Sequence, residues 1–125
     1  MNLTRAIVFG AALLLVGCAA VTPPQVRLPA PYTARGVSVT VDGLWTDDEG
    51  NVVGISGIAI NTSGRDLIMC MLSFDVLDAS GVKVSSAVAS TTGLKADQKW
   101  RFQATFMTPY RVNFTSIEAG TITAM

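Results

Sequence analysis

Few residues in this 125-residue sequence could carry chemistry, and histidine is not among them. Histidine is the commonest general base and metal ligand, so its absence excludes Ser-His-Asp and Cys-His arrangements. The acidic run Asp47-Asp48-Glu49 offers oxygen ligands for a hard cation. However, three consecutive side chains on one turn point in different directions, and their spacing does not match an EF-hand loop. We interpret this run as a solvated hairpin turn.

The remaining acidic and basic residues do not form a catalytic pattern. Asp75 and Asp78 lie three residues apart on a predicted strand and therefore face opposite sides, which excludes a carboxylate dyad. We expect Asp78 to cap the turn that follows. Ser-Lys catalysis would need a buried lysine, but Lys83, Lys95 and Lys99 fall at outward or loop positions. The sequence therefore predicts no catalytic residues and no enzymatic activity.

An apolar run near the N-terminus has the character of a signal peptide. Residues 1–5 carry one basic side chain, and residues 6–16 contain no charged residue. This run is shorter than the roughly 20 residues needed to span a bilayer. It ends in Leu15-Val16-Gly17-Cys18, which resembles the lipobox of bacterial lipoproteins, where the chain is cut before the cysteine. The resemblance implies a lipoprotein signal peptide over residues 1–17, and the alternative is an ordinary secretory signal.

The same resemblance gives Cys18 a role as the lipidation site. It implies a covalent diacylglycerol and an acyl chain on Cys18, which would anchor the protein in a bacterial membrane. A Cys18–Cys70 disulfide would compete with lipidation, and the flexible segment after Cys18 argues against the fixed geometry that a disulfide needs. We expect Cys70 to be a buried, inert thiol. Because Ala19 is not the Asp typical of inner-membrane retention, the resemblance implies the outer membrane, facing the periplasm.

Charge and proline content define the rest of the organisation. Removal of residues 1–17 takes away one basic and no acidic side chain, which leaves a net charge near −1. We therefore expect no nucleic-acid partner. Residues 18–35 contain four of the five prolines, a density that favours extended polyproline II. We expect residues 18–35 to form a lipidated N-terminus and linker, and residues 36–125 to form one domain.

Alternating hydrophobicity predicts strands throughout residues 36–125. Trp100–Phe106 alternates with its aromatic side chains inward, and the last strand, within residues 111–122, changes phase near Thr115-Ser116. Within Asp66–Asp78 the even positions form one apolar face, made of Ile68, Cys70, Leu72, Phe74 and Val76. Six to seven strands with short turns and no helix signal predict an all-β, immunoglobulin-like antiparallel β-sandwich. A small closed barrel is the alternative.

Three segments of this domain resemble the FxLYD domain: GIAIN (Gly57–Asn61), SFDVLDASGVKV (Ser73–Val84) and LKADQKWRFQATF (Leu94–Phe106). The first matches the family's Gly-x-x-x-Asn strand. In the second, Phe74 and Asp78 fall on the family's Phe and Asp, whereas Val76 and Leu77 replace its Leu and Tyr. The resemblance implies an immunoglobulin-like sandwich, often found in secreted or lipid-anchored bacterial proteins, with no known catalytic residues.

One outward-facing set of residues is unusually apolar. Leu67, Met69 and Met71 lie opposite the predicted core face and suit adaptable protein contacts, unless a loop or the linker covers them. We therefore expect a lipid-anchored binding or scaffolding module with an envelope protein as its partner. The alternative is a carrier of a small ligand or metal ion that uses loops, or a groove lined by Trp45 or Trp100, although we expect both tryptophans in the core. A purely structural envelope protein would give the same sequence signals.

Overall fold

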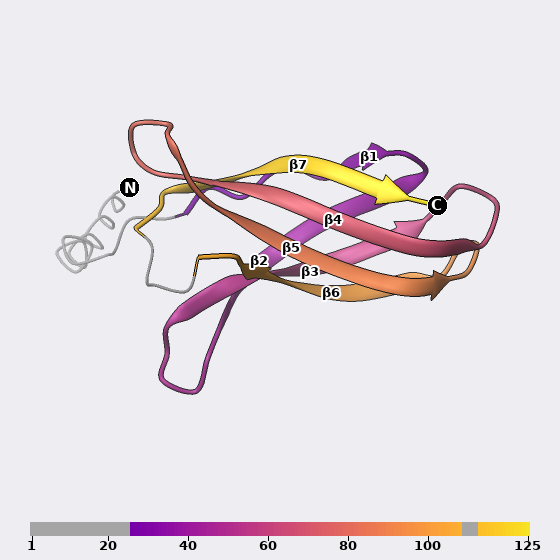
Figure 1. The fold of residues 1–125 in the computed structure, drawn as a ribbon, viewed down its shortest axis with the longest axis horizontal. Coiled ribbons are helices and arrows are strands. Elements are labelled where there is room, and N and C mark those ends of the chain that lie inside the picture. The colour runs from indigo at the N-terminus through magenta and orange to yellow at the C-terminus, as the bar shows by residue number, and fades with distance from the viewer. Residues whose placement is uncertain (1–25, 109–112) are drawn as a thin grey trace, which may run out of the picture.

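The structure, a computed structural model, describes residues 26–108 and 113–125. These residues form one antiparallel sheet of seven strands and no helix (Figure 1). The strands are β1 (Tyr32–Ala34), β2 (Val37–Thr46), β3 (Val52–Asn61), β4 (Leu67–Leu77), β5 (Lys83–Leu94), β6 (Lys99–Phe106) and β7 (Ser116–Ala124). The predicted all-β class is confirmed.

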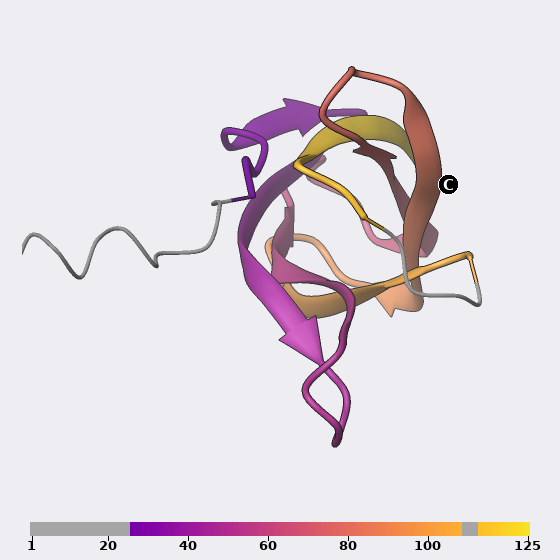
Figure 2. The same cartoon turned by 90° about the vertical axis from the view of Figure 1, so that its left-hand side faces the viewer.

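The sheet curls so strongly that its two halves become the layers of a sandwich (Figure 2). The strand order is β1-β2-β3-β6-β5-β4-β7, and the two halves join where β5 and β6 pair through Ala87↔Phe106 and Val88↔Thr105. With β2 counted as strand A, the β3–β6 and β4–β7 pairings correspond to the B–E and C–F pairings of an immunoglobulin-like sandwich. The predicted sandwich is confirmed, and the β5–β6 junction brings its shape close to that of a barrel.

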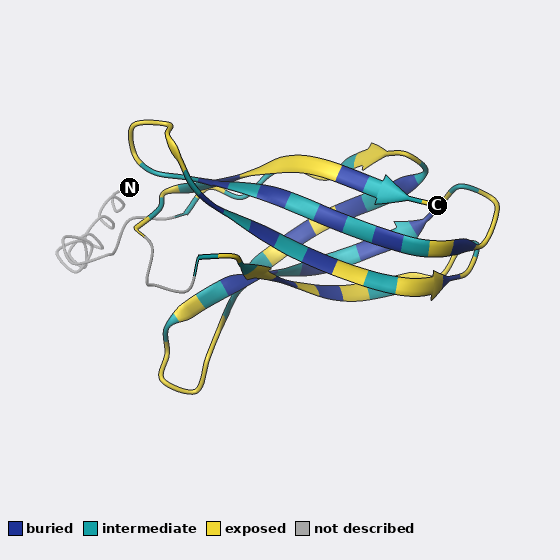
Figure 3. Ribbon diagram, in the orientation of Figure 1, coloured by how far each residue is buried: buried dark blue, intermediate teal, exposed yellow. Residues whose placement is uncertain are grey.

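The hydrophobic core fills the space between the two halves. Figure 3 shows the alternation of buried and less buried residues along the strands that produces it. The rings of Phe74 on β4 and Phe102 on β6 stack across this core with their centroids 5.7 Å apart. Burial of a large apolar side chain contributes about 1.5–3 kcal/mol. The predicted apolar face of β4 is fully buried from its fourth residue onward, at Cys70, Leu72, Phe74 and Val76.

The packing explains the glycine of the Gly57–Asn61 motif. A Cβ atom at Gly57 would overlap the carbonyl oxygen of Thr40 on β2 and would approach the ring of Phe102 to 2.7 Å. The carbonyl oxygen belongs to the paired backbone and the ring to the filled core, so neither can move aside without disturbing its neighbours. Glycine at this position therefore allows β3 to lie close to the aromatic core.

The asparagine of the same motif connects two loops. Asn61 is fully buried, and its side-chain amide donates to the carbonyl oxygens of Arg65 at 2.7 Å and Leu94 at 3.0 Å. Its Oδ1 accepts from the backbone N–H of Ser63 at 3.0 Å. A buried amide with all these partners satisfies polar groups that would otherwise be costly. Asn61 thus holds the β3–β4 loop against the end of β5.

The predicted boundary of the linker is wrong. Residues 26–35, which we expected in the linker, lie on the domain: Arg27 bridges Ser116, and β1 pairs with β2. Val26 and Leu28 pack against the core. The reason is that the extended backbone favoured by proline also fits a sheet edge, where a missing N–H faces away from the ladder. The predicted signal peptide, residues 1–17, and the rest of the predicted linker lie outside the described residues.

The predicted phase change of the last strand is also misplaced. β7 begins at Ser116, and its irregularity lies further along, where Gly120 and Thr121 stand opposite Ser73 alone. A Cβ atom at Gly120 would come within 2.6 Å of the Ser73 carbonyl oxygen. Glycine therefore lets β7 keep its pairing with β4 through this bulge.

Candidate interaction surface

Only one of the two cysteines lies among the described residues. Cys18, the predicted lipidation site, lies outside the described residues. Cys70 is fully buried on β4 and forms no disulfide. Its burial raises the pKa of the thiol, because the thiolate would lose its hydration. The prediction that Cys70 sits on the core face is confirmed.

The acidic residues hold turns. The Oδ1 atom of Asp47 accepts from the backbone N–H groups of Glu49 and Asn51, at 2.9 and 3.0 Å, and so shapes the exposed β2–β3 turn. Asp78 does the same for the β4–β5 turn, where Oδ1 accepts from Ser80 Oγ, at 2.8 Å, and from two backbone N–H groups. The hydrogen bond from the Ser80 side chain, with those from the backbone, lowers the pKa of Asp78. Both turn predictions are confirmed.

No cluster of three or more histidine, cysteine, aspartate or glutamate side chains that could hold a metal ion occurs within residues 26–108 and 113–125. The prediction that both tryptophans lie in the core is wrong for Trp45: both are partly buried, and of the two only Trp100 packs against the core. Trp45 Nε1 donates to the carbonyl oxygen of Ala104 at 3.3 Å, and the Trp100 ring lies 5.9 Å from that of Phe102, centroid to centroid. An open surface depression of about 590 Å³ lies elsewhere, lined by Asp78, Ala79, Ser80, Asn113, Phe114 and Thr115.

The predicted apolar strip on β4 is wrong at its first residue. Leu67 is only 1% exposed and belongs to the core, whereas Ile68, which we expected in the core, is 78% exposed. The inversion has a backbone cause. The N–H groups of both Ile68 and Met69 donate to the carbonyl oxygen of Met125, at 2.6 and 3.0 Å. Two residues facing one form a β-bulge, and a bulge reverses the side on which the preceding side chains lie.

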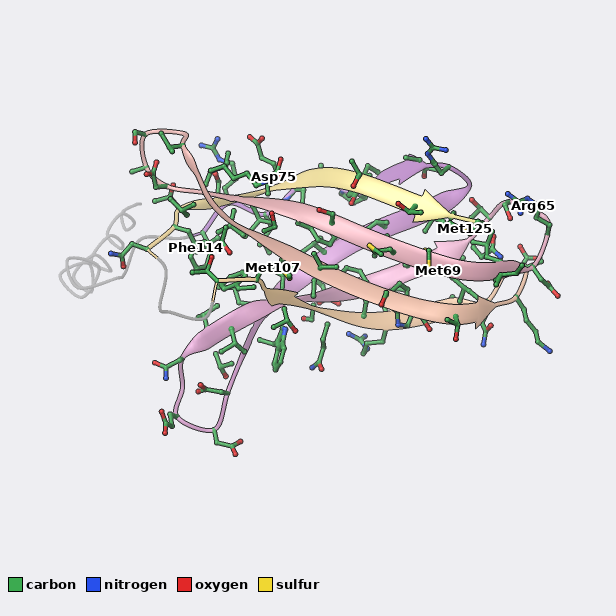
Figure 4. All side chains as sticks on the ribbon, viewed as in Figure 1. Arg65, Met69, Asp75, Met107, Phe114 and Met125 are labelled. Atoms are coloured by element: carbon green, nitrogen blue, oxygen red, sulfur yellow. The ribbon has the colours of Figure 1, made fainter. Side chains whose placement is uncertain are left out.

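The remaining residues of the strip, Met69 and Met71, form an apolar surface together with Ile68 and Met125. Met69 and Met71 are partly exposed, as the outward positions of β4. Met125 is 54% exposed. Its N–H donates to the carbonyl oxygen of Met69, so the two residues form a hydrogen-bonded pair and their side chains are cross-strand neighbours (Figure 4). We call Ile68, Met69, Met71 and Met125 the apolar surface.

Sequence reasoning missed Ile68 and Met125. The exposure of Ile68 depends on its pairing with Met125, which lies far away in the sequence. No periodicity within residues 66–78 could have indicated that pairing.

The apolar surface lies far from the place where the N-terminal segment joins the sheet. Arg27 exchanges backbone hydrogen bonds with Thr115 and Ile117 at the start of β7, whereas Met125 follows its end. Nine strand residues at ~3.4 Å each separate these points by about 30 Å. Arg65 lies at the same end as Met125, and Phe114 lies at the opposite one (Figure 4). One end of the domain therefore receives the N-terminal segment, and the other presents apolar side chains.

Comparison with protein-family models, curated proteins and solved structures finds no match to this chain. Among the described residues, none forms a helix that could cross a bilayer.

Proposed function

We propose that this protein is a lipid-anchored binding or scaffolding module of the bacterial envelope, without catalytic activity of its own. The observation that carries the proposal is the separation of about 30 Å between the start of β7, where Arg27 joins the sheet, and the apolar surface beyond its end. In a lipoprotein, acyl chains on Cys18 would hold the first end near the membrane. The apolar surface would then face away from the anchor toward a partner.

The proposed mechanism is tethering, in which a short connection to the anchor keeps the domain close to the membrane. With residues 26–35 on the domain, only residues 19–25 separate Cys18 from the sheet. Seven residues reach at most roughly 25 Å, since an extended chain spans ~3.6 Å per residue. A module held this close to a membrane meets membrane-associated partners at a high effective concentration, so weak contacts suffice. The partner we propose is another envelope protein, and the location is the outer membrane, facing the periplasm.

Met-rich contacts suit this role. Met side chains are flexible and polarisable, and they adapt to differently shaped partners. Ile68 and Met125 are among the most exposed large apolar residues of the described chain, and exposed apolar side chains gathered in one place mark interaction sites. The FxLYD resemblance agrees with the proposal, because that family implies a non-catalytic sandwich often found in lipid-anchored proteins.

The test is cross-linking in intact cells followed by mass spectrometry. It compares the wild type with Cys18→Ser fused to an ordinary cleavable secretory signal, so that both forms are exported. A partner captured by the lipidated form alone supports the tethered module. Ile68→Ser is expected to reduce that capture, whereas Val82→Ser, an equally conservative change at an exposed residue near the other end, leaves it unchanged. Absence of any reproducible partner in either form would contradict the proposal.

A carrier of a small ligand or metal ion is the second candidate. It would use the open surface depression of about 590 Å³ beside the β4–β5 turn, where a ligand would stay largely in contact with solvent. Asp78 at its rim already accepts three hydrogen bonds within the turn. A rise in melting temperature on addition of a divalent cation or a small apolar ligand would support this function, and unchanged melting would exclude it for the ligands tested.

A further inference from the structure

The two edges of the sheet differ. β1 has only three residues and follows Pro29 and Pro31, and short, proline-flanked edge strands resist pairing with other chains. β7 has nine residues. Within the described part of the chain its outer edge is bonded only at its start, where Arg27 N–H donates to the Thr115 carbonyl at 2.9 Å and Ile117 N–H donates to the Arg27 carbonyl at 2.8 Å. Beyond Ile117 no backbone hydrogen bond joins this edge to another described residue.

The backbone groups of this edge are accessible. Residues 118–121 are all exposed. Because hydrogen-bonding groups alternate between the two sides of a strand, those of Ala119 face outward like those of Ile117. Past the bulge, Met125 N–H turns inward to Met69, so the same alternation places the groups of Ala124 and Ile122 outward. The edge therefore has two short stretches of backbone donors and acceptors, one on either side of the bulge, that no other described residue binds.

We propose that the outer edge of β7 binds an extended peptide segment of a partner protein, added antiparallel to β7, with a lysine or arginine facing Glu118. Strand addition gains affinity from main-chain hydrogen bonds and specificity from alternate side chains. The antiparallel direction fits because every strand pair in the sheet is antiparallel, so that an added antiparallel strand continues the alternation of the whole sheet.

The charge near this edge selects the partner. Glu118 is exposed and has no ion-pair partner among the described residues. Its cross-strand neighbour on β4, Asp75, is already paired with Lys83, whose Nζ lies 3.1 Å from Asp75 Oδ1. A cation on an added strand would thus complement a free carboxylate. On the opposite face, the exposed Ala119 leaves room for an apolar side chain beside the core.

A second copy of this chain fits the edge poorly. Antiparallel pairing of two β7 strands through residues 117–119 would bring the two Glu118 carboxylates opposite or diagonal to each other. Like charges in such positions destabilise a strand pair. The negative charge therefore disfavours self-association and favours a cationic peptide.

This inference rests on the proposed function, since it names the class of partner segment that the module binds. The test uses the full chain, isotope-labelled in detergent micelles, and two blocked heptapeptides of alternating valine and threonine with a central lysine or glutamate. Amide shifts are expected at residues 117–124 and not at β1. Wild type should prefer the lysine peptide about two- to fivefold, the range of an exposed ion pair. Glu118→Lys should reverse that preference, whereas the control Glu49→Lys, in the β2–β3 turn, should keep it.

Three results would overturn strand addition. They are no shift on β7 at millimolar peptide, equal shifts on β1, or an unchanged peptide preference in Glu118→Lys. Photo-cross-linking in cells separates this inference from the proposed function. Capture of an envelope protein from a photoreactive residue at Ile68, but not at Ala119, would retain the binding module and reject the β7 edge. Capture at neither position would count against both.

Discussion

Replacement of Asn61 by alanine tests whether the buried amide holds the distal loops together. The change removes four hydrogen bonds of the Asn61 side chain, namely those to the carbonyl oxygens of Arg65 and Leu94 and those from the N–H and the Oγ of Ser63. At about 1 kcal/mol for each lost hydrogen bond, the free energy of unfolding should fall by roughly 4 kcal/mol. For a domain of this size, about 4–8 °C is lost per kcal/mol, so the melting temperature should fall by roughly 16–32 °C.

Thermal and urea unfolding, followed by far-UV circular dichroism, measure this loss. The matched control is Asn113→Ala, because Asn113 is exposed and surface substitutions usually change stability by less than about 0.5 kcal/mol. A loss below about 1 kcal/mol in Asn61→Ala would refute the reasoning. It would mean that water replaces the amide at little cost and that the loops do not depend on it.

Three further predictions concern single positions. Leu67→Ala should lower the free energy of unfolding by about 2–5 kcal/mol and Ile68→Ala by less than about 0.5 kcal/mol; the opposite order in urea unfolding would disprove the bulge at Met125. Gly57→Ala should cost at least about 2 kcal/mol in the same assay, because its Cβ meets backbone and an aromatic ring, and a neutral result would show that β3 can shift. The pKa of Asp78 is lower in the folded state than its ordinary value of 3.8, so this carboxylate stabilises the fold above about pH 4 and loses that contribution as the pH falls through the lowered pKa. Asp78→Asn should therefore show less acid destabilisation than the wild type between pH 5 and 2, roughly the window in which such carboxylates titrate, and identical profiles would contradict the role of this charge.

The candidate site was only partly accessible to sequence reasoning. Met69 and Met71 were placed correctly on the outer face, because strand alternation is a local property. Leu67 and Ile68 were exchanged because a bulge depends on the partner strand. The anchor at Cys18 stays a prediction from the lipobox resemblance.

The sequence by itself determined the elements whose causes are local. Alternation placed Cys70, Phe74 and Phe102 on core faces of their strands, and Asp78 marked its turn through contacts within four residues. Only the tertiary structure decided which strands meet. Residues 26–35 were predicted to be a linker, but in the fold β2 and the start of β7 provide hydrogen-bonding partners for them. The free edge of β7 was decided in the same way, because backbone groups are identical in every residue and their pairing depends on which strands the fold brings side by side.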